Sequence, residues 1–214
     1  ETDPTYRYLA AQAMASIRDS IALDSLHALL TDPVEEVRVA AVFAIGQIGS
    51  VGSVPKLIEA FAGNDTSGTW QHLNSRILEA VGKCGTLEHL RSLSTVTTYT
   101  RKDTALLLGQ VRGIYQFAMR GIVSPDGTAR MATLASNLQY PEEVRLYAAH
   151  YLGRAPEIDL GAYTRNLIDA TEQENNVNVR MALIIALGKC RTPEALTYLQ
   201  QRYALETDYR VRCN

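Results

Sequence analysis

The sequence has little of what membrane insertion, redox chemistry or polyanion binding requires. Its 214 residues include only three cysteines, one tryptophan and four lysines. No apolar run approaches the roughly 20 residues that span a bilayer as a helix. The net charge of −2 gives the whole chain no general attraction for nucleic acid. We therefore expect no membrane span, and nucleic acid is disfavoured as a partner.

Catalytic signatures are missing as well. The sequence contains no Gly-x-Ser-x-Gly, no Gly-Lys-Ser/Thr and no His-Glu-x-x-His, so no motif supports nucleophilic, phosphate or zinc chemistry. The acidic pairs Glu35-Glu36 and Glu142-Glu143 fall where the first turns of helices are expected, and the helix dipole explains them there. We expect no catalytic residues, no metal and no cofactor.

What the sequence does contain is a repeat. Its clearest copy is residues 31–49, and partial copies occupy residues 6–14, 73–85, 111–119, 141–153 and 178–190. Aligning the copies places one residue of each at an equivalent position, which we call the marked position: Arg7, Arg38, Asn74, Arg112, Arg145, Arg180 and Arg212. The successive spacings are 31, 36, 38, 33, 35 and 32 residues, a period typical of a two-helix unit.

Each copy has the pattern of a helix. In residues 31–49, small and apolar residues stand one before and three, six, seven and ten after the marked position, which is a helical stripe. Asp32 is expected to cap this helix, with Pro33 in its first turn and Glu35 completing a capping box. Glycine recurs eight residues after the marked position, where neighbouring backbones approach closely or the helix ends: Gly46, Gly82, Gly153 and Gly188.

The segments between the copies are expected to form the second helix of each unit. They are Ile21–Leu30, Val54–Ala62, Leu87–Val96, Thr128–Leu138, Leu160–Thr171 and Pro193–Ala204. Because one unit cannot bury its apolar face alone, residues 1–214 are predicted to form a single repeat array. The predicted fold class is all-α, a right-handed α-α superhelix of about six helical hairpins plus a truncated seventh. Glu1 in place of a methionine and a helix-like opening at 209–214 lead us to expect a fragment of a larger protein.

These copies resemble the HEAT-like repeats of the phycobilisome-lyase class. The pattern of that class is an Asp-Pro turn, Val-Arg, two or three alanines and Leu-Gly-x-Ile-Gly, and residues 31–49 match it closely. The fourth copy departs, because Arg120 stands where the glycine belongs and Asp103 lies too far upstream to cap in register. A longer helix or an irregular packing step is expected there.

The resemblance fits several functions, and the residues help to choose among them. Hydroxylases of this fold hold two irons with repeated His-Glu pairs, but this sequence has no His-Glu dipeptide. A bilin lyase or bilin chaperone is the alternative function, and Cys84 and Cys190 invite that hypothesis. Both cysteines fall ten residues after the marked position, on a face expected to be buried, so we interpret them as inert core thiols too far apart for a disulfide.

The recurring arginines admit two interpretations. A solenoid that aligned them would suit nucleic acid, whereas an arginine six residues after a turn aspartate more often bonds to neighbouring turns and carbonyl groups. The acidic overall balance agrees with the second interpretation. We therefore predict a structural ladder of arginines.

The predicted function is a non-catalytic scaffold that binds a protein or peptide on the concave face of the solenoid. Positions one, two, five and nine past the marked position point away from the core. They form an apolar and aromatic floor with a partly basic rim, suited to a segment that carries acidic residues. The candidate partner-binding residues are Phe43, Gln47, Glu79, Lys83, Phe117, Tyr147, His150, Arg154, Ile185 and Lys189. The competing interpretation is that Phe43, Phe117 and Ile185 pack between repeats.

Overall fold

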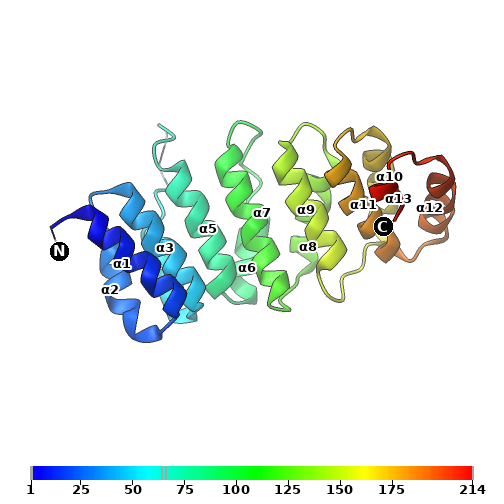
Figure 1. Cartoon of the computed structure of the whole chain (residues 1–214). Coiled ribbons are helices and arrows are strands. Elements are labelled where there is room, and N and C mark those ends of the chain that lie inside the picture. The colour runs from blue at the N-terminus through cyan, green and yellow to red at the C-terminus, as the bar shows by residue number, and fades with distance from the viewer. Residues whose placement is uncertain (1, 64, 66, 214) are drawn as a thin grey trace.

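The helices of the protein alternate between two layers (Figure 1). The computed structural model describes residues 2–63, 65 and 67–213. One layer holds the helices that carry the marked position, called the marked helices: α1 (Pro4–Ile17), α3 (Glu35–Ile48), α5 (Gln71–Cys84), α7 (Thr104–Met119), α9 (Glu142–Arg154), α11 (Val177–Cys190) and α13 (Tyr209–Arg212). The second layer holds α2 (Leu23–Leu29), α4 (Val54–Glu59), α6 (Leu87–Thr95), α8 (Pro125–Ser136), α10 (Thr164–Gln173) and α12 (Pro193–Leu205).

Consecutive marked helices pack side by side along the whole row. Each of them contacts the next, from α1 to α13, and α6, α8, α10 and α12 contact one another in the second layer. A continuous core of buried side chains runs from Ala11 in α1 to Ala195 in α12. Figure 1 shows the elongated row, with the two chain ends at opposite ends of it. The predicted all-α solenoid of helical hairpins is confirmed. Within the described residues, no helix combines the length and the apolarity needed to cross a membrane.

The second-layer helices match their predicted ranges to within about one turn. The largest differences have local causes. Helix α8 begins at Pro125 because the Ser124 hydroxyl caps it, accepting a hydrogen bond from the Gly127 N–H at 3.0 Å. Helix α10 begins late because residues 161–163 form a 3₁₀ turn first.

The start of α3 differs from the prediction. Its N-cap residue is Val34 and no side chain caps it, so the expected capping box of Asp32 and Glu35 is wrong. Asp32 instead accepts a hydrogen bond from the Val34 N–H at 2.9 Å and two from Arg7 of α1. The Asp32 side chain therefore joins two repeats. Helix α3 begins at Glu35, after the turn that this side chain stabilises.

In the fourth repeat the marked position is Gln110, two residues before the one chosen from the sequence. Gln110 is fully buried, and its Nε2 donates to the carbonyl oxygens of Leu93 and Val96, both at 2.8 Å. Asn74 does the same in α5, where its Nδ2 donates to the carbonyl oxygen of Ala62 at 3.1 Å. In each case a buried amide side chain donates a hydrogen bond to a main-chain carbonyl group in the segment that precedes its helix.

The backbone gives independent support for this register. Eleven residues past the marked position, three other repeats have a left-handed residue at the helix end: Arg18 (φ 59°), Gly49 (φ 77°) and Arg191 (φ 54°). Eleven residues past Gln110 lies Gly121, with φ 77°. The alignment on Arg112 was therefore wrong. The expected longer helix is confirmed, because α7 has 16 residues and its neighbours in the layer have 13 or 14.

The tightest joint of the array lies between α5 and α7. A Cβ at Gly82 would lie 2.2 Å from the Gly113 carbonyl oxygen, and one at Gly109 would lie 2.6 Å from that of Ser75, so only glycine fits these positions. The close backbone approach expected at Gly82 is thereby confirmed. At Gly188 a Cβ would meet nothing within 4 Å, so packing does not require glycine there.

Candidate binding face of the marked helices

The side chains at the marked position join neighbouring repeats. Arg7 makes two hydrogen bonds to the Asp32 carboxylate, at 2.6 and 3.0 Å, and Arg145 makes two to the Glu174 carboxylate, at 2.8 and 3.0 Å. Arg38 donates to the main-chain carbonyl of Asp32. Bidentate pairs of this kind fix geometry as well as adding energy. The predicted structural ladder of arginines is confirmed at these positions.

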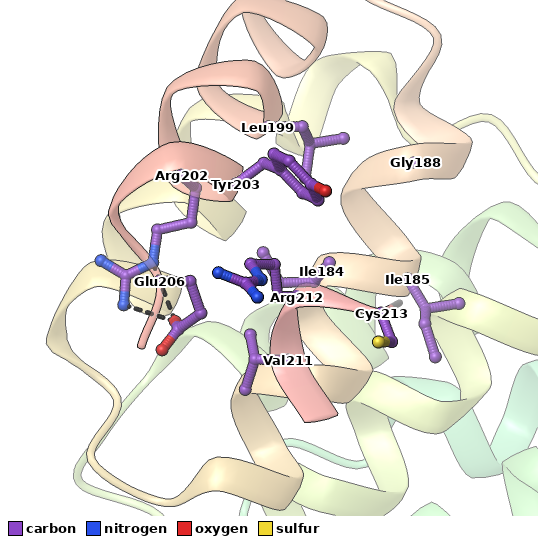
Figure 2. Close-up of a pocket in the computed structure, with 10 residues that line it drawn as sticks. All are labelled: Ile184, Ile185, Gly188, Leu199, Arg202, Tyr203, Glu206, Val211, Arg212 and Cys213. Atoms are coloured by element: carbon purple, nitrogen blue, oxygen red, sulfur yellow. Dashed lines mark hydrogen bonds and ion pairs between the residues drawn. The ribbon is translucent and has the colours of Figure 1, made fainter. Parts of the chain in front are cut away.

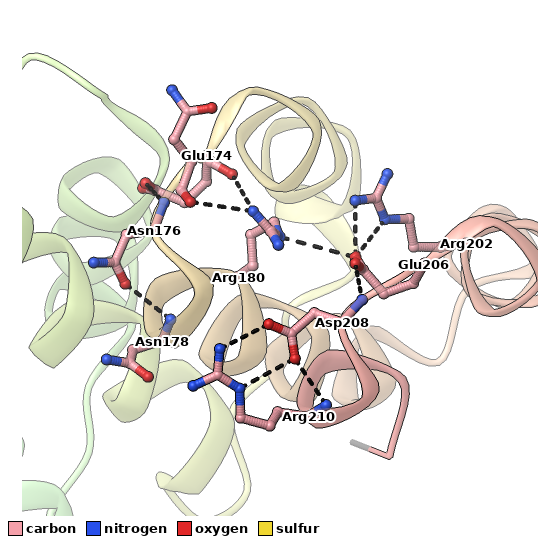
Figure 3. A network of polar contacts seen from close by, with 9 residues as sticks. Glu174, Asn176, Asn178, Arg180, Arg202, Glu206, Asp208 and Arg210 are labelled. Carbon is pink, nitrogen blue, oxygen red and sulfur yellow. Dashed lines mark hydrogen bonds and ion pairs between the residues drawn. The ribbon is translucent and has the colours of Figure 1, made fainter.

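Figure 3 shows the ladder near the C-terminal end of the array. Arg180 donates a hydrogen bond to the carbonyl oxygen of Glu174 at 3.1 Å and lies 3.8 Å from the Glu206 carboxylate. The same carboxylate accepts a hydrogen bond from Arg202 at 2.8 Å. Burial alone would raise the pKa of Glu206, but hydrogen bonds from the Asp208 N–H and from Arg202 hold that pKa below its usual value. The arginines of this network are therefore engaged in holding turns together.

The first group of candidate partner-binding residues lies on α3 and α5. The Phe43 ring is 38% exposed, and Lys83 Nζ lies 5.4 Å from its centroid. The same ammonium pairs with the Glu79 carboxylate at 3.0 Å, which Arg76 approaches at 3.4 Å. Gln47, one turn beyond Phe43, is half-buried. The structure brings these residues together, and the charge of Lys83 is already paired.

The second group lies on α7 and α9 and is richer in aromatic rings. The rings of Tyr115 and Tyr147 meet edge to face, with centroids 6.3 Å apart. Arg112 lies over the Tyr147 ring at 5.0 Å, and Arg154 donates to the Tyr115 hydroxyl at 2.8 Å. His150 is half-buried on α9, and its pKa is lowered by burial and then by the charge of Arg154. Two arginines and an imidazole that resists protonation thus accompany a tyrosine pair.

Phe117 does not belong to this face. Its side chain is fully buried, seven residues past Gln110, just as Ile45 is fully buried seven residues past Arg38. The prediction that Phe117 lines a binding surface is therefore wrong, and the packing interpretation holds for this residue. The residue five past Gln110 is Tyr115, which the shifted alignment missed. The left-handed glycine after α7 was the signal in the sequence that would have found it.

The third group lies between α9 and α11. Ile185 is 38% exposed, and a Cβ at Gly153 would lie 2.9 Å from its Cγ2, so the two helices meet there. Lys189 Nζ donates to the carbonyl oxygen of Ala155, just beyond the end of α9. The pKa of Lys189 is lowered by burial and then by the charge of Arg191. Both candidate residues therefore lie against α9 or its C-terminal end.

A pocket of about 400 Å³ opens beside Ile185, between α11, α12 and α13 (Figure 2). Leu199 and Val211 supply apolar wall, and Tyr203 is 65% exposed at its edge. The Arg212 guanidinium lies 5.9 Å from the Tyr203 ring centroid. The pocket continues the candidate surface toward the C-terminal end of the array.

The three groups lie on successive helices of the marked layer, and we call them together the marked face. Across each of three helix pairs, a cation of the later helix contacts the earlier repeat: Lys83 the α3 ring, Arg154 the α7 hydroxyl and Lys189 the end of α9. The marked face consists of Phe43, Gln47, Glu79, Lys83, Arg112, Tyr115, Tyr147, His150, Arg154, Ile185 and Lys189.

The cysteines behave as core residues. The Cys84 thiol donates to the Ile45 carbonyl oxygen at 3.6 Å, and burial raises its pKa to about 11. Burial also raises the pKa of Cys190, whose thiol donates to the Ala186 carbonyl oxygen at 3.6 Å. Neither forms a disulfide. Because thiols of this kind are poor nucleophiles, the interpretation as inert core thiols is confirmed, and a lyase role that would use them gains no support.

The histidines lie on four different helices. His27 is hydrogen-bonded to Ser53 at 3.0 Å, and His72 lies 3.8 Å from the Glu35 carboxylate. His89 accepts a hydrogen bond from the Thr86 N–H in a capping box. Across the described residues, no three His, Cys, Asp or Glu side chains gather in a way that would hold a metal ion.

The fold and the ladder define a class, the α-solenoids built from helical hairpins. Within that class, the family model for HEAT repeats matches residues 1–69 and 131–213. That is well over half of the chain, so the protein belongs to the HEAT-repeat family. The unmatched stretch contains the two repeats in which an amide, Asn74 or Gln110, replaces the arginine of the marked position. The narrower phycobilisome-lyase class stays a prediction.

Two solved structures are similar to this chain. Human deoxyhypusine hydroxylase in complex with glycerol is 17% identical with a TM-score of 0.43, over 99% of this chain and 77% of the hydroxylase chain. An engineered protein is 18% identical with a TM-score of 0.49, over 92% of this chain and 93% of its own. Similarity at this level carries no conclusion about activity. A comparison with curated proteins finds no match.

Proposed function

We propose that this protein is a non-catalytic scaffold that binds a protein or peptide segment on the marked face. The observation that carries the proposal is the set of partly exposed aromatic and aliphatic side chains on four of the marked helices, α3, α7, α9 and α11: Phe43, Tyr115, Tyr147 and Ile185. Aromatic anchors with arginines beside them are the composition of energetic centres in protein interfaces. They stand on packed helices, so little ordering of the surface is required when a partner binds.

Selection of binding peptides tests the proposal directly. A random peptide library displayed on phage is selected against the immobilised protein, and the selected peptides are measured against two variants. The face variant carries Phe43→Ala, Tyr147→Ala and Ile185→Ala. The control variant carries Ile58→Ala and Leu196→Ala, which remove two exposed aliphatic side chains, 55% and 59% exposed, from the second layer.

We expect the selected peptides to lose at least about tenfold in affinity for the face variant and to bind the control variant as they bind the parent protein. Circular dichroism at 222 nm checks that both variants remain helical. Equal binding to both variants, or selection that yields no peptide, contradicts the proposal.

A further inference from the structure

The C-terminal half of the marked face carries an unusual surplus of positive charge. Helices α7, α9 and α11 contain acidic residues only at Glu142 and Glu143, in the first turn of α9. Among the ion pairs of the described residues, none includes Arg112, Arg120, Arg154 or Lys189. These four cations therefore stand without a carboxylate partner in a protein whose net charge is −2.

Arg112 lies against the Tyr147 ring, and the other three cations donate hydrogen bonds to neutral oxygens. Arg120 Nη1 donates to the carbonyl oxygens of Gly82 and Gly85, and Arg154 Nη1 donates to the Tyr115 hydroxyl. A guanidinium has five N–H donors. Each of these exposed guanidinium groups thus keeps donors that a carboxylate of a partner can occupy without breaking a contact of the fold. The positions are fixed in advance by the bonds already made.

The spacing of the cations suits one particular kind of chain. Arg120 follows α7, Arg154 ends α9 and Lys189 lies in the last turn of α11, so one cation stands at the same end of each successive helix. Packed helices lie about 8–10 Å apart. A chain in the extended polyproline-II conformation advances about 3.1 Å per residue and has three residues per turn, so every third side chain points to the same side, about 9 Å along. A chain of this kind that crosses the helices presents every third side chain to the next cation.

We propose, on the basis of the function proposed above, that the partner is an extended acidic segment that crosses α7, α9 and α11 with carboxylates at every third residue. Its carboxylates pair with Arg120, Arg154 and Lys189. The intervening side chains contact the exposed Met119 (46%), the tyrosine pair and Ile185. The negative charge of the segment complements a part of the marked layer in which four cations have no carboxylate partner.

Nucleic acid fits the same surface less well. Arg112 lies against the Tyr147 ring and Tyr115 meets the edge of that ring, so a base has no open pair of ring faces to stack on. The cations form a single row. Exposed acids such as Asp126, Glu172 and Glu194 on the second layer add repulsion for a polyanion.

A designed peptide tests the assignment. The probe is a fluorescein-labelled peptide of about twelve residues with glutamate at every third position and leucine and serine between, and its control replaces each glutamate by glutamine. Binding is measured by fluorescence anisotropy at several salt concentrations. The cation variant Arg120→Gln/Arg154→Gln is compared with Arg91→Gln/Arg165→Gln, which removes the same charge from the second layer.

We expect the acidic peptide to bind with an affinity that falls as salt rises. The affinity should fall about fivefold in the Arg120→Gln/Arg154→Gln variant but not in the second-layer variant. Equal binding of the glutamine peptide, or binding of neither peptide, overturns the inference. So does tighter binding of a single-stranded oligothymidylate, or a salt-sensitive dimer that blocks the peptide. Because phage selection on the marked face is independent of peptide charge, these failures are distinguishable from failure of the proposed function.

Discussion

At the scale of single residues, different side chains at the marked position make equivalent hydrogen bonds between repeats. An arginine reaches the carboxylate of the next turn at Arg7 and Arg145, and an amide reaches the carbonyl groups of the preceding turn at Asn74 and Gln110. What is constant is a buried or partly buried hydrogen-bonding side chain between repeats. The position is defined by its surroundings rather than by its charge.

The Asp32 carboxylate gives this role a pH dependence. The hydrogen bonds from Arg7 hold the pKa of Asp32 below its usual value of 3.8, against the opposing effect of burial. A carboxyl group with a lowered folded-state pKa stabilises the fold above that value, and the stabilisation is lost as the pH falls through the folded-state pKa. We expect Asp32→Asn to cost about 2 kcal/mol of unfolding free energy at pH 7.

The difference between the parent protein and Asp32→Asn should narrow as the pH falls below 4. Urea unfolding followed by circular dichroism at pH 7 and pH 3 measures it. Glu172→Gln, which neutralises an exposed acid of α10, is the matched control and should change little at either pH. A gap that stays constant with pH would show that Asp32 acts through packing and not through its charge.

The sequence predicted the positions of single residues correctly where the helical pattern was clear. It failed in the fourth repeat, where two alignments of the repeat were possible. Phe43, Ile185, Arg154 and the core cysteines lie where the helical stripe placed them. In the fourth repeat, the sequence was aligned on Arg112 because most copies have an arginine at the marked position. In the correct register Ala118 occupies the glycine position, so no glycine at that position indicated the error. A shift of two residues on a helix turns the predicted face by about 200°, which exchanged the buried ring of Phe117 for the half-exposed ring of Tyr115.

At the scale of elements, glycine decides how closely two helices pack. We expect Gly82→Ala to destabilise the protein by about 3 kcal/mol, because a Cβ would lie 2.2 Å from the Gly113 carbonyl oxygen and the backbones must separate. Gly188→Ala is the matched variant, eight residues past the marked position on α11. Nothing lies within 4 Å of its added Cβ, and alanine favours a helix by about 1 kcal/mol over glycine.

Thermal unfolding of the two variants should therefore shift the midpoint in opposite directions, down for Gly82→Ala and up for Gly188→Ala. Two downward shifts of similar size would mean that both glycines are required for helix ends and not for close packing.

Element boundaries were predictable to about one turn because apolar periodicity and turn residues define them together. The errors lie at helix starts. The sequence of the Asp-Pro turn predicts a cap at Asp32, yet the aspartate is drawn to Arg7 of the preceding repeat, a contact that no local pattern contains. The residue at which such a helix begins therefore depends on contacts between repeats, which local sequence patterns do not contain.

At the scale of the whole molecule, each repeat is held mainly by its two neighbours. Apolar side chains are exposed near both ends of the described array, including Tyr6 (63%) and Leu9 (53%) on α1 and Leu196 (59%) and Tyr203 (65%) on α12. We expect amide hydrogens of α5, α7 and α9 to exchange more slowly than those of α1 and α12. Mass-spectrometric hydrogen exchange measures this. Equal protection along the array would show that it opens as one cooperative unit.

The joint between α5 and α7 also has a mechanical consequence. A stack of helices can bend when the side chains between neighbouring helices slide past one another. Between α5 and α7 the backbones are in direct contact at Gly82, Gly109 and Gly113, so no layer of side chains is there to slide. We expect bending and twisting to concentrate at the coils on either side. The α5–α7 pair would then stay rigid, while the repeats on either side change their curvature to fit a bound partner.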